Sequence, residues 1–243
     1  MPRARRFALF ILIGLIAATQ TAWSAALRVE PVSVEVAAPG ASSTLTLRNE
    51  ASDSVAVQIR VFRWQQVDGE DKLEPTDDVV ASPPAVTLSK GNSNIVRVVR
   101  VSKAPVAREE SYRVWVDQLP DRVVQPGQVV NFLVRYSIPV FFTNAQANAP
   151  ALDWSASVRR DAITISAVNK GDRRMRVSAL KIRDEKGQTH SFGNGLIGYV
   201  LARSSMNWTA PVPSSFNVGG SVSITAESDS GPVNAVAKPS ARR

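Results

Sequence analysis

The chain has 243 residues, a formal net charge of +8 and no cysteine. The lack of cysteine excludes disulfide bonds and thiolate chemistry, and the length is enough to bury one large core or two medium ones. The lysines and arginines do not form clusters interleaved with aromatic residues, so the basic charge favours acidic protein partners and does not indicate nucleic-acid binding.

The N-terminal segment has the pattern of a secretory signal peptide. Three arginines among the first six residues precede an apolar run over residues 7–18, which is too short to span a bilayer. Ala22 and Ser24 then offer the small side chains that a signal peptidase reads, which predicts a signal peptide over residues 1–24. We therefore expect an exported chain with no stable membrane insertion after cleavage, and an uncleaved anchor helix is the alternative.

Period-two alternation, which is typical of strands, dominates residues 25–143. Within this region the stretch from Ser82 to Val101 contains two adjacent prolines followed by Gly91. Proline cannot donate to a strand ladder, so we expect the pair to end a strand of one sheet and to start a crossing, with a turn at Gly91. We expect the strand after this turn to help build the wall of the same sandwich.

A second set of strands is predicted after a small, polar, proline-terminated hinge at residues 144–150. Strands resume over residues 151–230, and residues 231–243 have the composition of a disordered tail. Prolines and glycines recur at intervals of roughly ten residues, which is typical of β-sandwiches. The predicted fold is therefore all-β, with two immunoglobulin-like β-sandwich domains.

No motif in the sequence indicates an enzyme, a cofactor site or a metal site. Residues 193–198 match G-x-G-x-x-G, but a strand pattern follows them where dinucleotide binding requires a helix, so we interpret them as a loop. His190 is the only histidine, which is too little for a zinc site or a nucleophile–base pair. The acidic residues at 68–71 and 77–78 lack the spacing of a calcium loop and are expected to be solvated.

One predicted strand, over residues 129–142, is unusually long and apolar. Val130, Phe132 and Val134 share one of its faces, and Leu133 lies on the other. A strand that is apolar on both faces is normally a central, buried strand. The alternative is an edge strand whose apolar side chains bind another protein, because an open edge templates the addition of a strand.

Several short motifs follow one another in a recognisable order: Ser82-Pro83-Pro84, "SYRVWVDQLP" at 111–120, "IPVFF" at 138–142, Val168-Asn169-Lys170-Gly171, and Gly198-Tyr199-Val200-Leu201. Together they resemble the periplasmic pilus-assembly chaperones of the chaperone–usher pathway, and particularly the archaic branch of that family. Their order and spacing carry the resemblance, which covers most of the chain after residue 24. The resemblance implies an L-shaped pair of domains with a cleft between them, and it implies that the strand after Gly91 lies beside the partner-binding edge of the first domain.

The resemblance also implies a function. The chain would act in the periplasm, bind pilin or fimbrial subunits by donor-strand complementation, and pass them to an outer-membrane usher. Val130, Phe132 and Val134 would be the donor-strand residues, with Leu133 facing the chaperone's own core. No cofactor is implied.

The family's carboxylate anchor is not present in its usual form. Members of the family use an arginine on the first strand and a lysine on the seventh to bind the C-terminal carboxylate of the subunit. Ser33 and Pro139 occupy these places here. An ionised carboxylate still needs a cation when it loses water, and we expect Arg113 to supply it, with Arg135 as the second choice.

A secreted two-domain adhesion or carbohydrate-binding module is the alternative function. Such a module would present an exposed aromatic platform with polar neighbours. The sequence instead places the four tryptophans that follow the signal segment within strand patterns, which favours positions in the core. They are Trp64, Trp115, Trp154 and Trp208.

Overall fold

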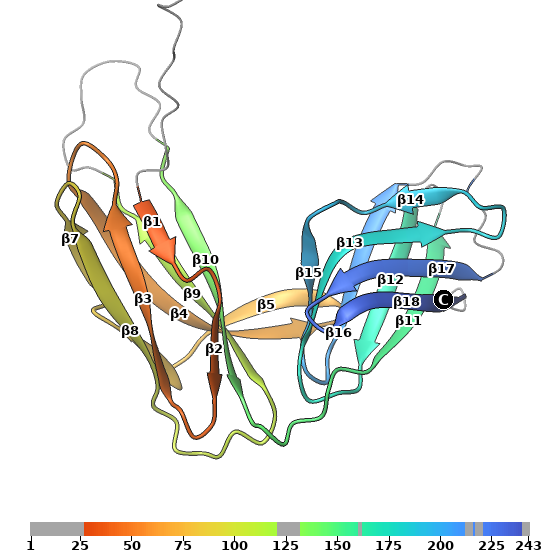
Figure 1. Ribbon diagram of the computed structural model, residues 1–243, viewed down its shortest axis with the longest axis horizontal. Coiled ribbons are helices and arrows are strands. Elements are labelled where there is room, and N and C mark those ends of the chain that lie inside the picture. The colour runs from red at the N-terminus through yellow and green to blue at the C-terminus, as the bar shows by residue number, and fades with distance from the viewer. Residues whose placement is uncertain (1–26, 121–131, 160–161, 212–215, 217–220, 240–243) are drawn as a thin grey trace, which may run out of the picture.

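The computed structural model describes residues 27–120, 132–159, 162–211, 216 and 221–239. They form two all-β domains, which meet at an angle as two arms, in agreement with the expected L-shaped arrangement (Figure 1). No helix in these ranges is long and apolar enough to cross a membrane. The predicted signal peptide lies outside the described residues.

The first domain is a sandwich of two sheets. One sheet has the strand order β1-β3-β8-β6, and the other has the order β2-β10-β9-β4-β5, with β7 also paired to β4. Strand β2 runs parallel to β10, whereas the other pairs are antiparallel. The strands are β1 (Leu27–Glu30), β2 (Val34–Ala37), β3 (Ser42–Asn49), β4 (Val55–Val67), β5 (Glu70–Pro75), β6 (Val79–Ser82), β7 (Ala85–Leu88), β8 (Ser93–Arg100), β9 (Glu110–Gln118) and β10 (Arg135–Thr143).

Alternation along β9 separates the core of this domain from its outer surface. Tyr112, Val114 and Val116 point between the two sheets and are fully buried. Arg113 and Trp115 point to the opposite side, which is the side turned toward the second domain. We call this side of the β4–β9–β10 layer the concave face.

The two prolines mark the point where the chain changes sheets. Strand β6 ends at Ser82 in the β1-containing sheet, and β7 begins at Ala85 in the β10-containing sheet, so the predicted crossing is confirmed. Gly91 lies in the following turn with φ of +73°, a region that glycine enters without steric cost. Strand β8 then joins the sheet opposite β10, so the expectation that it lies beside the partner-binding edge is wrong.

In the described residues, the second domain has eight strands in the order β14-β13-β17-β18-β11-β12-β16, with β15 paired to β13. Residues 231–239 were predicted to belong to a disordered tail, and this prediction is wrong, because they form β18 between β17 and β11. The strands are β11 (Leu152–Arg159), β12 (Ala162–Asn169), β13 (Met175–Arg183), β14 (Thr189–Ser191), β15 (Leu196–Val200), β16 (Ser205–Pro211), β17 (Val222–Ser228) and β18 (Gly231–Pro239).

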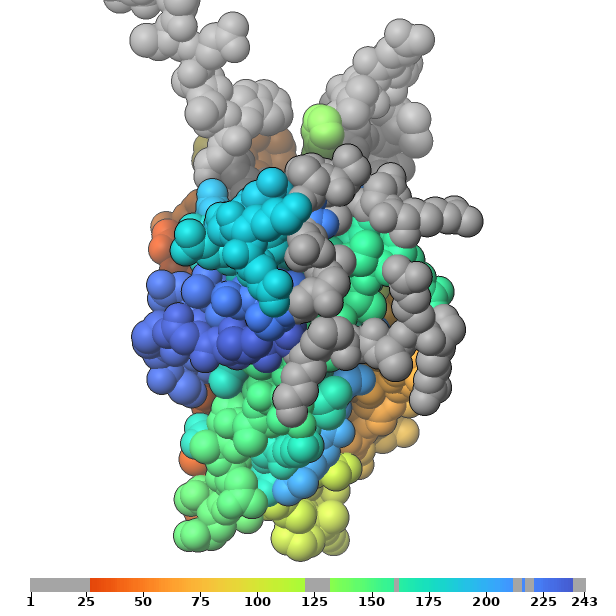
Figure 2. Space-filling model, turned by 90° about the vertical axis from the view of Figure 1, so that its right-hand side faces the viewer, coloured from red at the N-terminus to blue at the C-terminus, as the bar shows by residue number. Residues whose placement is uncertain are grey.

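The long β4–β5 hairpin connects the two domains. Gln66 accepts a hydrogen bond from the Leu201 backbone N–H (2.9 Å) and donates one to the Tyr199 carbonyl (2.8 Å). At the hairpin tip the Asn207 N–H donates to the Gly69 carbonyl (2.9 Å). A Cβ atom on Gly69 would lie 2.0 Å from the Asn207 side chain, so this contact needs a glycine. The hairpin, in orange, reaches the second domain in both views (Figures 1 and 2).

A buried arginine forms a second connection. Arg174, which directly precedes β13 in the second domain, donates to Glu109 through Nη1 (2.7 Å) and through its backbone N–H (2.9 Å), and it also pairs with Glu35. Its guanidinium carbon lies 3.5 Å from the ring centroid of Phe141. The side chain of Glu109 is fully buried, so this carboxylate depends on Arg174 and on a hydrogen bond from Thr143 (3.1 Å) for its partners.

Candidate functional site

Strand β10 has an open edge along Arg135–Pro139. It pairs with β9 from Arg135 to Phe142 but with β2 only from Val140 onward. In the described part of the chain, no strand lies along the other side of Arg135–Pro139. The Gln118 N–H donates to the Val134 carbonyl (3.0 Å), and hydrogen-bonding direction alternates along a strand, so the backbone of Ser137 faces the open side.

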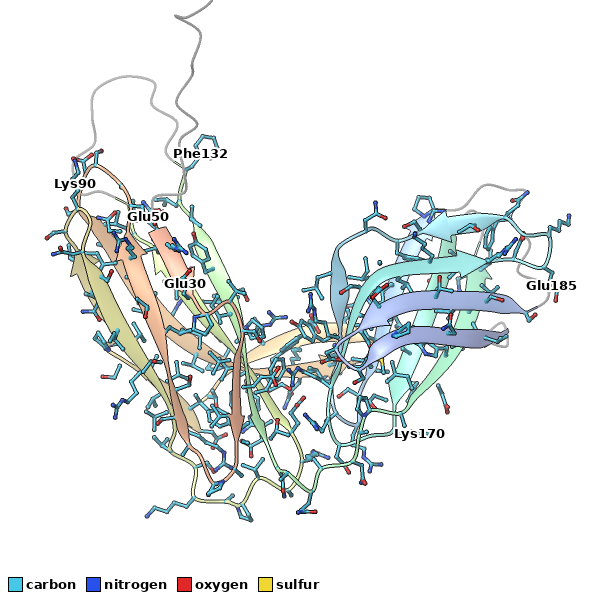
Figure 3. The ribbon with its side chains drawn as sticks, viewed as in Figure 1. Glu30, Glu50, Lys90, Phe132, Lys170 and Glu185 are labelled. Carbon is cyan, nitrogen blue, oxygen red and sulfur yellow. The ribbon has the colours of Figure 1, made fainter. Side chains whose placement is uncertain are left out.

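The residues just before this edge expose apolar side chains. Phe132 is 86% exposed and points away from the strands of the first domain (Figure 3). Val134 is half-buried, and the side chains on the same face of β10 become fully buried from Ile138 onward. Val130, the third predicted donor-strand residue, lies outside the described residues.

Leu133 does not face the core, so that expectation is wrong. It is 50% exposed, because the core lies on the face of β10 that carries Ile138 and Val140, whereas Leu133 precedes the strand and has the parity of the exposed Arg135 and Ser137. The apolar segment from Phe132 to Val134 therefore lies at the rim of the domain, and the buried part of the long predicted strand begins further along.

Arg113 lies on the concave face where the two domains meet. Its guanidinium carbon is 3.7 Å from the ring centroid of Trp64 and 5.8 Å from that of Tyr199. Its Nη1 donates a long hydrogen bond of 3.4 Å to the outward-facing carbonyl of Ser137, which places the guanidinium beside the open edge. Burial lowers the pKa of Arg113, although Asp71 opposes this effect.

Arg113 has no carboxylate within ion-pairing distance in the described part of the chain. An arginine remains protonated in proteins even when burial lowers its pKa. The concave face therefore holds a desolvated positive charge beside an open strand edge, and a carboxylate could neutralise it there.

Arg135, the second candidate, lies at the other end of the open edge. Its Nε donates to Asp117, which also accepts a hydrogen bond from Arg60 (2.6 Å). Although burial alone would raise the pKa of Asp117, the hydrogen bonds from Arg135 and Arg60 lower it below its usual value. Arg135 thus already has a carboxylate partner, in contrast to Arg113.

Ser33 and Pro139 occupy the two positions of the family's usual anchor, and only Pro139 lies close to Arg113. Pro139 is the direct cross-strand neighbour of Arg113 in the β9–β10 pairing. Ser33 lies in the turn between β1 and β2 and supplies no cation. Arg113 therefore places a positive charge one strand away from Pro139, at the same level of the sheet.

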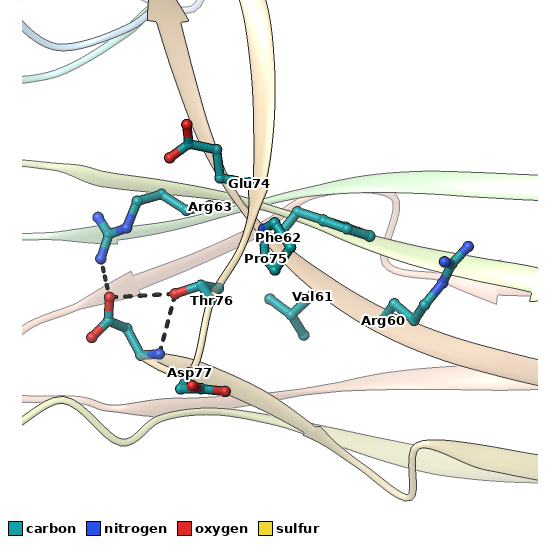
Figure 4. A pocket seen from close by; sticks show the side chains of 9 residues that line it. Arg60, Val61, Phe62, Arg63, Glu74, Pro75, Thr76 and Asp77 are labelled. Carbon is teal, nitrogen blue, oxygen red and sulfur yellow. Dashed lines mark hydrogen bonds and ion pairs between the residues drawn. The ribbon is translucent and has the colours of Figure 1, made fainter.

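A second concave feature lies on the far edge of β4. A cavity of about 730 Å³ is bounded by residues 60–63 of β4 and residues 74–78, which follow along β5 and the turn after it (Figure 4). An ion pair between Arg63 and Asp78, supported by Thr76, spans part of it. Two of its charged groups, Arg63 and Asp78, neutralise each other, and Arg60 is paired with Asp117, so this cavity is a weaker candidate than the open edge.

Chemical sites of other kinds find no support in the described residues. No three acidic or histidine side chains are grouped so as to bind a metal ion there. His190 packs edge-on against Phe192, with 5.6 Å between the ring centroids. Trp115, which was predicted to be in the core, is instead half-buried on the concave face. The other three tryptophans are buried as predicted.

The sequence was compared with models of known protein families, and one of them matches. The model described as "Pili and flagellar-assembly chaperone, PapD N-terminal domain" matches residues 26–147, just over half of the chain. The chain belongs to this family. The recognition of a pilus-assembly chaperone from the sequence is thereby confirmed, and the adhesion or carbohydrate-binding alternative loses its basis.

Solved structures of such chaperones share the two-domain fold. A chain of the CsuC–CsuE chaperone–tip adhesion subunit complex from the archaic Csu pili of Acinetobacter baumannii is 23% identical, with a TM-score of 0.66, over 88% of this chain and 98% of that chain. A chain of the Salmonella enterica SafA pilin–SafB chaperone complex is 17% identical, with a TM-score of 0.59, over 90% and 98% of the two chains. These matches confirm the two immunoglobulin-like domains. No curated protein sequence matches the chain.

Proposed function

We propose that this chaperone binds pilin subunits in the periplasm along the open edge of β10 and delivers them to an outer-membrane usher. The subunit pairs its backbone with Arg135–Pro139 and takes up the apolar side chains that precede this edge. Its C-terminal carboxylate binds Arg113. Backbone pairing and apolar burial drive the association, and no nucleotide or metal is involved.

The open edge is the observation that carries this proposal. The backbone of Ser137 faces away from β9 with no strand beside it in the described residues, and such an edge accepts an added strand. The 86% exposure of Phe132 next to this edge supplies an apolar anchor of the kind that protein interfaces bury. In a strand paired with the subunit, the period of two would place Val134 on the same face as Phe132.

Two of the similar structures are complexes that agree with the proposal. One is a chaperone in a pre-assembly complex with a tip adhesion subunit, and the other is a chaperone in complex with a pilin. A third similar structure is described as a periplasmic chaperone, which supports the same compartment here. The archaic origin of the first complex supports the archaic branch that the sequence motifs indicated.

Co-expression with a pilin subunit tests the proposal directly. When a secreted subunit encoded next to this chain is produced with it in the periplasm, the two proteins should purify as an equimolar complex. The subunit alone should be degraded or aggregate, because its apolar groove stays exposed. A subunit that remains soluble and monomeric without the chaperone would contradict the proposal.

The donor strand is tested by replacing Phe132 with serine. The side chain is 86% exposed, so the free energy of unfolding should change by less than about 0.5 kcal/mol. Capture of the subunit should weaken by about 1.5–3 kcal/mol, because a buried aromatic anchor is lost from the complex. Urea denaturation and pull-down measure the two effects separately.

Ile95→Ser provides a matched control. Ile95 is also largely exposed, but it lies on β8 in the sheet opposite β10, so both unfolding and capture should remain unchanged. If Phe132→Ser destabilises the free protein and the folded fraction still binds normally, Phe132 is a structural residue and is not part of the donor strand.

A further inference from the structure

A cluster of aromatic and charged side chains occupies the concave face at the Arg135 end of the open edge. The guanidinium carbons of Arg135 and Arg60 lie 4.0 Å and 5.4 Å from the ring centroid of Trp115. Phe62 packs against the same indole, with 4.6 Å between the ring centroids. We call these four residues together with Asp117 the Trp115 patch.

The Trp115 patch carries a fixed excess of positive charge. Its two guanidinium groups share one carboxylate, that of Asp117, which is only 11% exposed. Arg135 is 51% exposed and Arg60 is also accessible, so both retain N–H groups that face solvent. The aromatic rings and Asp117 hold both guanidinium groups in place. A second carboxylate could therefore bind these groups without ordering a flexible arginine side chain.

The register of the sheet relates this patch to Arg113. Arg113 is opposite Pro139, and Asp117 is opposite Arg135, so the two cationic groups are four residues apart along β10. Four residues of an extended strand span roughly 13 Å. Strand β2 occupies the edge of β10 from Val140 onward. An added strand whose C-terminal residue lies beside Arg113 therefore has its preceding residues along Pro139–Arg135, with the earlier residues closer to Arg135.

This geometry determines which side chain of the added strand meets the patch. Residues at the same level on neighbouring strands point to the same face of a sheet. If the last residue of the strand lies level with Pro139, the fourth residue before it lies level with Arg135 and points to the concave face.

We propose that the Trp115 patch is a second recognition site for the subunit, and that it binds an acidic side chain on the fourth residue before the subunit's C-terminus. This inference rests on the proposed function and extends it from carboxylate capture to selection among subunits. The excess positive charge and the accessible guanidinium groups favour an acidic side chain over an apolar one. The continuity of the patch with the open edge favours the subunit as the partner that carries it.

Four fluorescein-labelled dodecapeptides of alternating valine and serine test the inference by fluorescence polarisation. The first has glutamate on the fourth residue before a free C-terminus, and the second has glutamine there. The third carries the glutamate one residue later, and the fourth is the first peptide with an amidated C-terminus. The first should bind about tenfold more tightly than the second, because a charge-assisted hydrogen bond is gained.

The third peptide should bind no better than the second, because a shift of one residue moves the glutamate to the opposite face. Arg135→Gln, and independently Arg60→Gln, should remove the tenfold preference while leaving the effect of C-terminal amidation intact. Circular dichroism checks that each variant is folded, and two separate variants keep the test valid if one of them is not.

Failure of the inference and failure of the proposed function give different results. Equal binding of the first and second peptides, with weaker binding of the amidated one, overturns the second site and retains carboxylate capture. Loss of the amidation effect in Arg135→Gln would make Arg135 the carboxylate anchor and would also overturn the inference. Absence of binding by all four peptides overturns both.

Discussion

Replacing Arg174 with alanine is expected to lower the free energy of unfolding by about 3–5 kcal/mol, because it leaves a buried charge without its partner. The side chain of Glu109 is fully buried, and two of its hydrogen bonds come from Arg174. The backbone N–H remains after the substitution, but the guanidinium charge does not. Urea denaturation, followed by tryptophan fluorescence, measures the loss.

Two further variants separate this effect from a general sensitivity of the domain junction. Arg203→Ala removes a solvent-exposed ion pair with Asp172 and should change the free energy of unfolding far less. The double variant Arg174→Met with Glu109→Gln should recover much of the loss, because neither charge is then buried. A loss for Arg174→Ala no larger than that for Arg203→Ala would show that Glu109 finds another partner or water.

The sequence predicted most of the strands, because their burial follows local alternation. It did not predict β18, since the alternating residues there are small and follow Pro232, so they resemble a polar tail. Strand β5 is acidic and has little intrinsic strand propensity; it forms because β4 pairs with it and its tip contacts Asn207. Tertiary pairing, rather than local sequence, determines both strands.

The candidate site was predicted in part. Period two grouped Phe132 with Val134 as donor-strand residues, which stays a prediction, and it could not show that β10 begins at Arg135 or that Leu133 is exposed. The half-buried position of Trp115 depends on which face of β9 meets the second domain, and a single strand pattern does not contain that information.

The buried junction between the domains had no signal in the sequence. Glu109 and Arg174 are 65 residues apart, and each looks like an ordinary charged residue in its own segment. Only the contact between the two domains brings them together. The same contact places Tyr199 beside Arg113, so the environment of the expected carboxylate anchor is also a product of the domain arrangement.

Arg113→Met should weaken subunit binding by about 2–5 kcal/mol, because a desolvated carboxylate would lose its partner. Methionine retains the apolar contact with Trp64, so the folded chaperone should lose little stability. Removing a buried charge that has no counter-charge can even stabilise the free protein, since burial already disfavours that charge. Binding and folding should therefore respond in different directions.

The comparison with Arg135→Met decides which cation binds the C-terminal carboxylate. Arg135 is already paired with Asp117, so its removal should not reduce the difference in binding between free and amidated C-termini, whereas removal of Arg113 should abolish that difference. Arg113→Lys should restore part of the binding, because a lysine keeps the charge but loses the fork of N–H donors. If Arg113→Met bound a free C-terminus as tightly as the unmodified chaperone does, Arg113 would be a packing residue of the domain junction. The open edge of β10 would then bind the subunit through its backbone and apolar side chains alone.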